Sequence, residues 1–451
     1  MVSSPSPWTE ENRIPRKESG DPFYLTTWYT GTREERRATP SNTYVRADGM
    51  TVTLEDGTVL EDWTGQVFAN NVGFGRPEVA KAMLTQSMRL SWVSPGEFAE
   101  PRIALTEELR TILPHGLTVP VFGVGGSDSI EAAVRAARKV TRRSKVLTFT
   151  QAYHGDTMIV ENLSGYGLTT YGDPRPWAVH TLSPYILWQA LDSWGEAYDA
   201  CLRGIEKALR RHGPRTFAAM IVEPVMCSYG AIPLSRDLAR GINELCERYG
   251  IKLISDEVVT GFGRTGAWFG AQTVGLKPDA VVLAKGITSG YAPLGAAILE
   301  TSWGRSLRKT GFPHGLTWAG HPIACAAALA TIRILKEERL VERAREMGAY
   351  LRERLETLKE ERLDLVEDVR GRGLILGVEL KGKGRKKAGA HPAWPRVKAV
   401  REGLLNDGIK VTPNSDGSTI ILTPPFIVTE EQVDRLAASL GRRLRVIARR
   451  P

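Results

Sequence analysis

Between residues 120 and 299 the chain alternates short, β-branched apolar runs with longer amphipathic or loop segments. Short apolar runs bounded by Gly, Pro or Asp are typical of strands that are buried on both faces. The pattern therefore predicts an α/β fold, with a large, mostly parallel sheet and helices on both of its faces. The predicted strands span residues 119–124, 145–149, 218–222, 252–255, 280–283 and 296–299.

The pattern changes from residue 321 onward, where apolar residues recur at spacings of three and four and predict long helices. A capping-box sequence, Thr429 to Gln432, marks the start of the last helix. Residues 381–395 are rich in Lys, Gly and Pro and are predicted to form a surface loop. The other predicted elements are helices over 322–335 and 341–358 and strands over 374–380, 409–412 and 419–422.

These patterns divide the chain into three parts. Residues 66–320 are predicted to form a large domain around the parallel sheet, and residues 321–451 a smaller α+β domain. Residues 1–65 are expected to pack with the smaller domain. The 451 residues exceed a typical domain length, yet large α/β folds fill such a span as one catalytic unit.

The composition is that of an ordinary globular protein, with 42% hydrophobic and 25% charged residues. No apolar run approaches the ~18 residues that span a bilayer, and the N-terminus lacks the apolar region of a signal peptide. We therefore expect a cytoplasmic protein without a membrane partner. The four cysteines are widely spaced without a CxxC pair, so we expect small buried apolar residues rather than disulfides or metal ligands.

The net charge of +9 raises the hypothesis of a nucleic-acid partner, because basic patches bind phosphate. Lys and Arg cluster at residues 138–145, 381–387 and 442–450. These runs have no interleaved aromatic residues and match no nucleic-acid motif. Solvated helix faces and a loop are the favoured interpretation, so no nucleic-acid partner is predicted.

A Gly-rich turn opens the first candidate site, where G-V-G-G-S at residues 123–127 joins a predicted strand to a helix. Backbone N–H groups at a helix N-terminus hold a phosphate, and glycines let the chain approach it closely. A plain tight turn remains the alternative. The turn has neither GxGxxG nor GxxxxGK[ST] spacing, so it does not indicate a dinucleotide or a nucleoside triphosphate.

Two charged residues follow neighbouring apolar runs: Asp256 comes directly after residues 252–255, and Lys285 closely follows residues 280–283. Ligands of α/β proteins bind at the carboxyl ends of parallel strands. Burial would lower the pKa of the Lys285 amine and make it nucleophilic. Taken alone, Asp256 is as readily a helix cap, and Lys285 a side chain that reaches the surface.

A phosphate cradle, a carboxylate and a buried lysine are together the three groups that a pyridoxal 5′-phosphate (PLP) enzyme needs. The cradle anchors the cofactor. The carboxylate keeps the pyridine nitrogen protonated through a charge-assisted hydrogen bond of about 1.5–3 kcal/mol. The lysine forms a Schiff base and later serves as the general base.

The order and wording of these segments resemble the class III (ω-amino) aminotransferases of PLP fold type I, the group of ornithine and 4-aminobutyrate aminotransferases. The resemblance covers nearly the whole chain, and its most specific segment is D-E-V-V-T-G-F-G-R-T-G at residues 256–266. The other matching segments, in the order that the family requires, are Tyr153-His-Gly155, Glu223-Pro224, Lys285-Gly286 and H-G-L-T-W-A-G-H-P at residues 314–322.

The resemblance implies a PLP site with the residues of that family. Gly126, Ser127 and Asp128 would bind the phosphate. Tyr153 would stack on one face of the ring, and Val258 would pack against the other.

The same resemblance assigns the reacting groups. Asp256 would hold the pyridine nitrogen, and Lys285 would form the Schiff base. Thr317 would reach the phosphate of the neighbouring subunit, which implies a homodimer with two shared active sites. His154 is expected only to support its loop, and Arg264 to be a structural ion-pair partner.

The chain departs from the family where an α-carboxylate would bind. Members that use glutamate hold it with an arginine before the C-terminal Pro-Pro, and a glutamate that we match to Glu223, beside the cofactor, frees that arginine. The matching position here is Ile421, and a second arginine of amine-type members corresponds to Pro413-Asn414. A guanidinium is the natural partner of a carboxylate, so we predict a substrate without one.

The leading prediction is an aminotransferase that moves an amino group from a donor amine or amino acid to an aldehyde or ketone, with an oxidised sugar as one candidate. Trp28, Trp92 and Trp318 lie in segments that line the substrate entrance in relatives, although a place in the core is equally compatible. An aminomutase, an epimerase or a decarboxylating aminotransferase on the same scaffold is the alternative. A non-catalytic or nucleic-acid-binding protein would need neither Lys285 nor Asp256.

Overall fold

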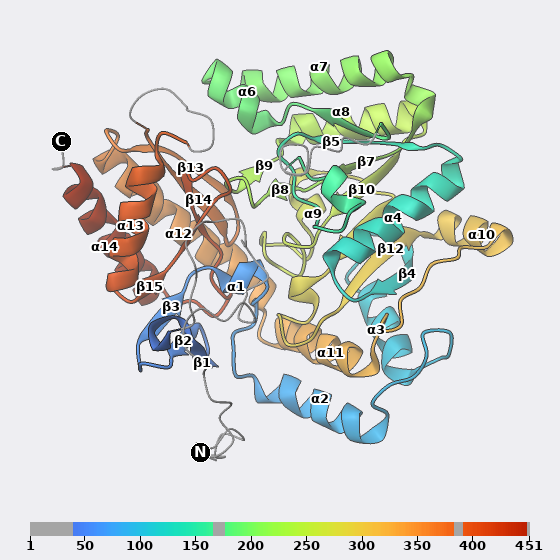
Figure 1. Ribbon diagram of the computed structural model, residues 1–451, viewed down its shortest axis with the longest axis horizontal. Coiled ribbons are helices and arrows are strands. Elements are labelled where there is room, and N and C mark those ends of the chain that lie inside the picture. Colours follow the sequence, from blue (N-terminus) through green and yellow to red (C-terminus); the bar gives the residue numbers. More distant parts are fainter. Residues whose placement is uncertain (1–38, 166–175, 383–390, 449–451) are drawn as a thin grey trace.

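The computed structural model describes residues 39–165, 176–382 and 391–448 (Figure 1). A seven-stranded sheet forms its centre. In spatial order its strands are β4 (Leu117–Gly123), β12 (Gly295–Glu300), β11 (Ala280–Leu283), β10 (Lys252–Asp256), β7 (Phe217–Val222), β5 (Lys145–Phe149) and β6 (Ala178–Thr181). β12 runs antiparallel to both of its neighbours, whereas the other neighbouring strands are parallel, which confirms the predicted large, mostly parallel sheet.

Helices cover both faces of this sheet (Figure 1). One face packs against α4 (Gly126–Thr141) and α10 (Thr301–Thr310). The other face packs partly against α7 (Trp194–His212) and α8 (Arg236–Tyr249), and partly against α3 (Glu100–Arg110) and α11 (Pro322–Glu337). Because both faces are covered, a central strand such as β7 is apolar and buried throughout. Polar side chains are therefore found where the strands end.

The C-terminal part, from residue 321 onward, contains a second sheet in the order β13-β14-β17-β16. The strands are β13 (Val366–Arg372), β14 (Ile375–Leu380), β17 (Thr419–Leu422) and β16 (Thr412–Pro413). The helices that follow α11 are α12 (Leu340–Glu361), α13 (Trp394–Asn406) and α14 (Glu430–Ala448). At the start of α14, Thr429 and Gln432 exchange hydrogen bonds between side chain and main chain, as the capping box predicts.

An N-terminal three-stranded meander joins this C-terminal part. Its strands β1 (Tyr44–Asp48), β2 (Thr51–Leu54) and β3 (Val59–Asp62) form a sheet with β15 (Ile409–Lys410), which pairs in parallel with β3. The remaining elements are α1 (Gly65–Phe68), α2 (Pro77–Arg89), α6 (Pro184–Leu191), α9 (Gly270–Val274), β8 (Val225–Met226) and β9 (Ile232–Pro233), with 3-10 turns at Pro40–Asn42, Val160–Asn162, Pro214–Thr216 and Lys285–Ile287.

Two details of the sequence-based prediction were wrong. The loop predicted over residues 381–395 ends earlier, because Trp394 and Pro395 begin α13, where proline fits the first turn of a helix. The strand predicted over 409–412 is split into β15 and β16, which belong to different sheets. All four cysteines are buried and free, as predicted.

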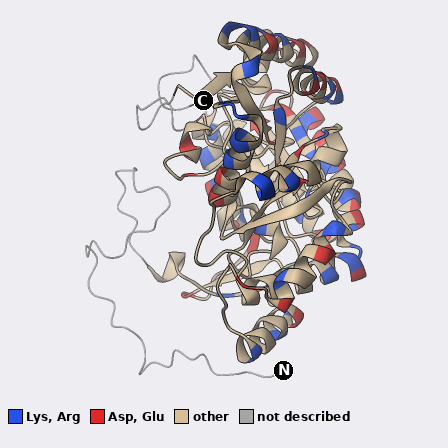
Figure 2. Cartoon of the chain, turned by 90° about the vertical axis from the view of Figure 1, so that its right-hand side faces the viewer, with Lys and Arg blue, Asp and Glu red and all other residues tan. Residues whose placement is uncertain are grey.

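Charge is mixed on the side of the molecule that Figure 2 shows. On the face shown in Figure 2, Lys and Arg are interspersed with Asp and Glu along the outer helices. In the basic run near the C-terminus, Arg442 and Arg443 both contact the carboxylate of Asp407. Within the described ranges, no helix combines the length and the apolar character needed to cross a membrane.

Candidate active site

Asp256 ends β10 and is almost fully buried, with 4% of its surface exposed. One carboxylate oxygen accepts a hydrogen bond from the main-chain N–H of Val258 at 3.1 Å. The other is 2.7 Å from Nδ1 of His154. A buried carboxylate needs such donors, because it is otherwise strongly disfavoured away from water. The site is thus built around a charge that the fold holds in place.

His154 has a larger role than loop support, which is all that the sequence suggested. Its side chain is buried, and its Nε2 lies 3.2 Å from the hydroxyl of Thr148. Because the Asp256 carboxylate can only accept, Nδ1 carries the proton, and in the neutral imidazole Nε2 accepts from Thr148. In sequence His154 follows a predicted parallel strand, β5, whose carboxyl end lies at the same sheet edge as that of β10, with β7 between them.

Glu223 follows β7 and is engaged by the main chain. Its Oε1 accepts from the N–H of Tyr153 at 3.1 Å, and the N–H of Cys227 donates to the same carboxyl group. Burial raises the pKa of Glu223 to about 7, with Asp256 acting in the same direction and His154 against it. This geometry fixes Tyr153 and leaves Glu223 few ways to move.

Lys285 begins the 3-10 turn that follows β11, in a left-handed conformation with φ of +44°. Burial lowers the pKa of its amine, opposed by the nearby Cys227, Asp256 and Glu223. Its Nζ lies 5.2 Å from the centre of the Phe68 ring. The structure therefore brings Lys285 and Asp256 into one site, as predicted, and keeps the amine in a state that favours its neutral, nucleophilic form.

Phe68 was not found by sequence reasoning. It ends a turn of four consecutive residues, Gly65 to Phe68, that all have positive φ. The buried Asp62 stabilises this turn by accepting from the N–H groups of Thr64 and Gln66, at 3.1 and 3.0 Å. Left-handed backbone is strained for residues other than glycine, and such strain is concentrated at functional sites. Here the strained turn holds the Phe68 ring over Lys285.

The Gly-rich turn is held by Asp128, whose carboxylate accepts from the N–H groups of Val124 and Gly125 at 2.6 and 2.8 Å. That carboxylate is therefore occupied, and only the main-chain N–H of Asp128 remains for an anion. Ser127 Oγ accepts from the N–H of Asp156 at 3.3 Å. A Cβ on Gly126 would lie 3.1 Å from the Val258 side chain, so Gly126 and Val258 are neighbours.

The predicted tryptophans have different outcomes. Trp28 lies outside the described residues. Trp92 and Trp318 are 41% and 56% exposed, so a place in the core is wrong for both. Their rings lie 5.8 Å apart, and Trp92 Nε1 donates to the carbonyl of Thr317 at 3.3 Å. Thr317 is exposed as well.

Two buried arginines near this site are occupied. Arg264 was predicted to be an ion-pair partner, but its guanidinium donates to neutral oxygens of Leu374, Pro424, Asn70 and Asn71 instead. Arg370 is held by Glu379 at 2.6 Å and by Asp368 at 3.3 Å. Both terminal nitrogens of Arg264 are thus engaged, with only its buried Nε left without a partner, so neither guanidinium offers a substrate carboxylate a two-pronged contact.

These residues fit PLP. The first N–H groups of α4 have no partner within the helix and carry its partial positive charge, which suits the phosphate. Glycines let a bound anion approach the main chain of this turn closely, and Gly126 also keeps room beside Val258, which a Cβ there would crowd. Asp256 and Lys285 supply the carboxylate and the amine. When bound, PLP supplies an aldehyde that condenses with amines and a ring that accepts an electron pair.

Comparison with known proteins decides the family. Residues 33–444 match the family described as Aminotransferase class-III. The chain belongs to the class III aminotransferases. Members of this class use PLP, and the present chain is therefore a PLP-dependent aminotransferase with the fold type I architecture that its sequence predicted.

Curated relatives in this class have different substrates. Diaminobutyrate–2-oxoglutarate transaminase of Halomonas elongata is 30% identical over 424 residues, which cover 89% of this chain and 90% of the relative. Putrescine–pyruvate aminotransferase of Pseudomonas aeruginosa is 31% identical over 404 residues, covering 87% and 88%. The family is thus shared, while the substrates named for these two relatives differ.

A solved structure is similar over almost its full length. The amine transaminase from an uncultivated Pseudomonas species, in a PLP-bound form, has a TM-score of 0.87 and 30% identity, and the match covers 95% of this chain and 99% of that one. The cofactor site of this class III aminotransferase therefore lies in a fold that is known to hold PLP.

Proposed function

We propose that this class III aminotransferase transfers an amino group to an aldehyde or ketone that has no α-carboxylate. The observation that carries this proposal is an apolar cluster at Lys285. It consists of the buried residues Phe68, Val225, Cys227, Ala231, Ile375 and Ile421. An isoleucine in such a cluster offers no hydrogen-bond donor to a carboxylate. Burying a substrate carboxylate without a donor costs several kcal/mol.

The neighbouring arginines support the same proposal, because Arg264 and Arg370 both hold protein oxygens. The apolar cluster favours an acceptor with an apolar group next to its carbonyl, more than an oxidised sugar. The curated relatives include a putrescine–pyruvate aminotransferase, so an amine donor is compatible with this class. An aminomutase, epimerase or decarboxylating aminotransferase remains the alternative, since the same cofactor groups serve all of them.

The roles of the site residues belong to this proposal. Lys285 binds PLP and then moves the proton at the substrate carbon that carries the amino group. Asp256 holds the pyridine nitrogen. The first turn of α4, with Gly126, Ser127 and the N–H of Asp128, binds the phosphate. Tyr153, Val258 and Glu223 enclose the ring.

We expect carboxylate-free acceptors to react faster than the 2-oxo acids that match them. Phenylacetaldehyde and phenylpyruvate, or acetaldehyde and pyruvate, differ only by the carboxylate group. Starting from the aminated form of the cofactor, the aldehyde of each pair should have a kcat/KM at least about 10-fold higher, because the carboxylate would lose water without gaining a donor. The rates are measured by stopped-flow absorbance. A clear preference for 2-oxoglutarate or pyruvate would refute the proposal and indicate a carboxylate site elsewhere.

We further propose a homodimer with shared active sites. Large exposed apolar side chains gather on α2, on α3 and on the segments beside them, and include Leu84, Met88, Trp92, Phe98, Ile103 and Trp318. Exposed apolar patches of this kind mark protein interfaces. The patch adjoins Thr317, through the hydrogen bond from Trp92, and the family resemblance assigns Thr317 to the cofactor of the neighbouring subunit.

Phe98→Asp should weaken this dimer by at least about 100-fold and lower activity with it. A two-fold interface contains each residue twice, and each buried Phe contributes about 1.5–3 kcal/mol. Light scattering against protein concentration measures the effect. Val446→Asp, which alters an exposed apolar residue of α14, should stay dimeric. A wild-type enzyme that is monomeric and fully active would contradict the proposal.

Two further parts of the sequence-based prediction are kept as proposals. We propose a division into residues 1–65, 66–320 and 321–451, which the pairing of β3 with β15 supports for the N-terminal part. We also propose a cytoplasmic location, in keeping with four cysteines that are free and buried.

A further inference from the structure

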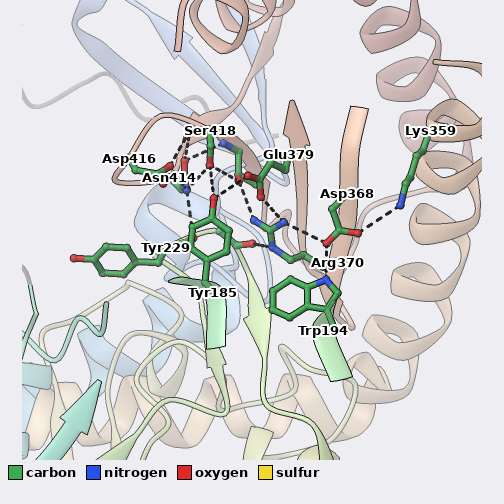
Figure 3. Close-up of polar contacts among 12 residues, drawn as sticks. Tyr185, Trp194, Tyr229, Lys359, Asp368, Arg370, Glu379, Asn414, Asp416 and Ser418 are labelled. Carbon is green, nitrogen blue, oxygen red and sulfur yellow. Dashed lines mark hydrogen bonds and ion pairs between the residues drawn. The ribbon is translucent and has the colours of Figure 1, made fainter. Parts of the chain in front are cut away.

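The segment between β8 and β9 is held by the C-terminal part of the chain (Figure 3). Three consecutive carbonyl groups, those of Ser228, Tyr229 and Gly230, each accept a hydrogen bond from a residue of that part. The donors are Ser415 through N and Oγ at 2.9 and 3.0 Å, Asn414 through Nδ2 at 3.3 Å, and Arg370 through Nε at 2.8 Å. We call residues 228–230 the pinned segment.

Arg370 is fixed on every side. Besides its ion pairs with Glu379 and Asp368, its Nη2 donates to Thr419 Oγ1 at 3.0 Å. Three aromatic rings of α6 and α7 surround the guanidinium, with centres 5.1, 5.6 and 5.9 Å away, namely Tyr185, Trp188 and Trp194. Cation–π contacts of this kind are strongest where water is excluded. Arg370 is therefore held in one conformation, and its hydrogen bond fixes the position of the Gly230 carbonyl.

Gly230 and Asn414 are equally constrained. Gly230 has a φ of +117°, and a Cβ there would lie 2.7 Å from Arg370 Nη2, so no other residue fits. The Asn414 amide uses both of its ends. Its oxygen accepts from the N–H groups of Ser418 and Thr419, each at 2.9 Å, while its nitrogen donates to Tyr229 O.

The pinned segment adjoins the apolar cluster at Lys285. Val225, Cys227 and Ala231, on either side of it, belong to the apolar cluster that contains Phe68 and Ile421. Burial raises the pKa of the Cys227 thiol to about 12, so this side chain stays neutral and acts as an apolar surface. A movement of the pinned segment would shift Cys227 and Ala231 relative to Phe68, which lies beside Lys285.

We propose that Asn414 and Arg370 are positioning residues that set the size of the acceptor pocket by fixing residues 228–230. This inference rests on the proposed function, because it takes the apolar cluster as the wall against which the acceptor binds. The C-terminal part of the chain thus determines specificity without touching the reacting atoms.

The test begins with Asn414→Ala in the holoenzyme and the apoenzyme. Loss of the bond to Tyr229 should raise the hydrogen exchange rates of the Gly230 and Ala231 amides by at least about 10-fold in both forms. The ratio of kcat/KM for a bulky acceptor to that for a small one should rise by at least about fivefold, since pocket fit controls such ratios. Ser415→Ala, which keeps its main-chain bond to Ser228, should shift both quantities less and in the same direction.

The matched control is Asn243→Ala, which removes a similar bond, from Nδ2 to the carbonyl of Gly275 at 2.8 Å, at an exposed position. It should change neither quantity. Arg370→Met is expected to unfold the protein, because Glu379 would remain as a buried, unpaired carboxylate, so the Asn414 and Ser415 variants carry the test.

Unchanged exchange in Asn414→Ala would overturn the proposal, because the segment would not depend on this bond. Faster exchange with an unchanged size ratio would also overturn it, since the segment would then not shape the pocket. The size ratio is measured within whichever acceptor class reacts best. A preference for 2-oxo acids would therefore refute the carboxylate-free acceptor and leave this test intact.

Discussion

Replacing Lys285 with alanine is expected to lower the rate of amino-group transfer by at least about 10⁴-fold. The expected loss has two causes. A Schiff base with the enzyme needs a primary amine, and alanine offers none. The proton at the substrate carbon would also lose its base, which by itself accounts for about 10²–10⁴-fold.

The fold should survive this change. Alanine keeps the Cβ that the left-handed conformation at φ of +44° already accommodates, so no new backbone strain arises. Burial lowers the pKa of the Lys285 amine, which means that the native state disfavours the charged form. Removing that amine should therefore not lower the thermal unfolding temperature of the apoenzyme, and the turn that begins α4 should still bind the phosphate.

Borohydride reduction of the holoenzyme followed by peptide mapping tests the assignment directly. The reduced cofactor should be attached to Lys285 in the wild type and to no residue in Lys285→Ala. Lys252→Ala is the matched control, because Lys252 begins β10 at the other end of the sheet, where it pairs with Asp279 at 2.7 Å. A cofactor attached to another lysine would show that the catalytic amine lies elsewhere.

The strands of the central sheet could be predicted from the sequence because burial on both faces makes them wholly apolar. The bounds of β5 and β11 agree with the prediction at both ends. β6, with the sequence A-V-H-T, was missed because it is short and half polar. β13 was missed because V-E-D-V-R-G-R is rich in charge, and the burial of Arg370 within it depends largely on partners outside the strand, such as Glu379.

Prediction of the site from the sequence has the same limit, because local patterns do not reveal contacts between distant residues. Lys285 and Asp256 follow apolar strands, so their meeting at one sheet edge could be predicted. The partnership of His154 with Asp256 joins residues that are 102 positions apart, and no local pattern announces it. Phe68 reaches Lys285 through a left-handed turn that is held by Asp62, by main-chain hydrogen bonds and by tertiary packing, and a periodicity of apolar residues does not reveal such a turn.

Replacing Asp256 with asparagine should leave PLP bound and slow amino-group transfer by about 10- to 150-fold. A charge-assisted hydrogen bond contributes about 1.5–3 kcal/mol, and we expect this contribution in the step that moves an electron pair into the ring. A neutral amide cannot keep the pyridine nitrogen protonated. Binding should be retained, because the phosphate and the Lys285 amine hold the cofactor independently.

The local hydrogen bonds can adapt to this change. In Asp256→Asn the amide oxygen can still accept from the N–H of Val258, and the amide nitrogen then faces His154 Nδ1. His154 accommodates a donor there by moving its proton to Nε2, which donates to the Thr148 hydroxyl at the present distance of 3.2 Å. We therefore expect a tautomer switch rather than unfolding, visible as a change in the imidazole ¹⁵N shifts of the apoenzyme.

Two measurements, the rate of the half-reaction that transfers the amino group and the imidazole ¹⁵N shifts of His154, separate the effect of the Asp256 charge from its structural effect. Asp279→Asn is the matched control, since Asp279 also accepts from a main-chain N–H, that of Leu253 at 2.9 Å, but lies away from the site. It should leave both the half-reaction rate and the His154 signal unchanged. If Asp256→Asn shows the tautomer switch with a half-reaction rate near that of the wild type, Asp256 only orients His154, and the charge that activates the ring has to come from another group. A slow half-reaction together with the switch would instead mean that the carboxylate charge itself is needed, because every other bond at this position has been replaced.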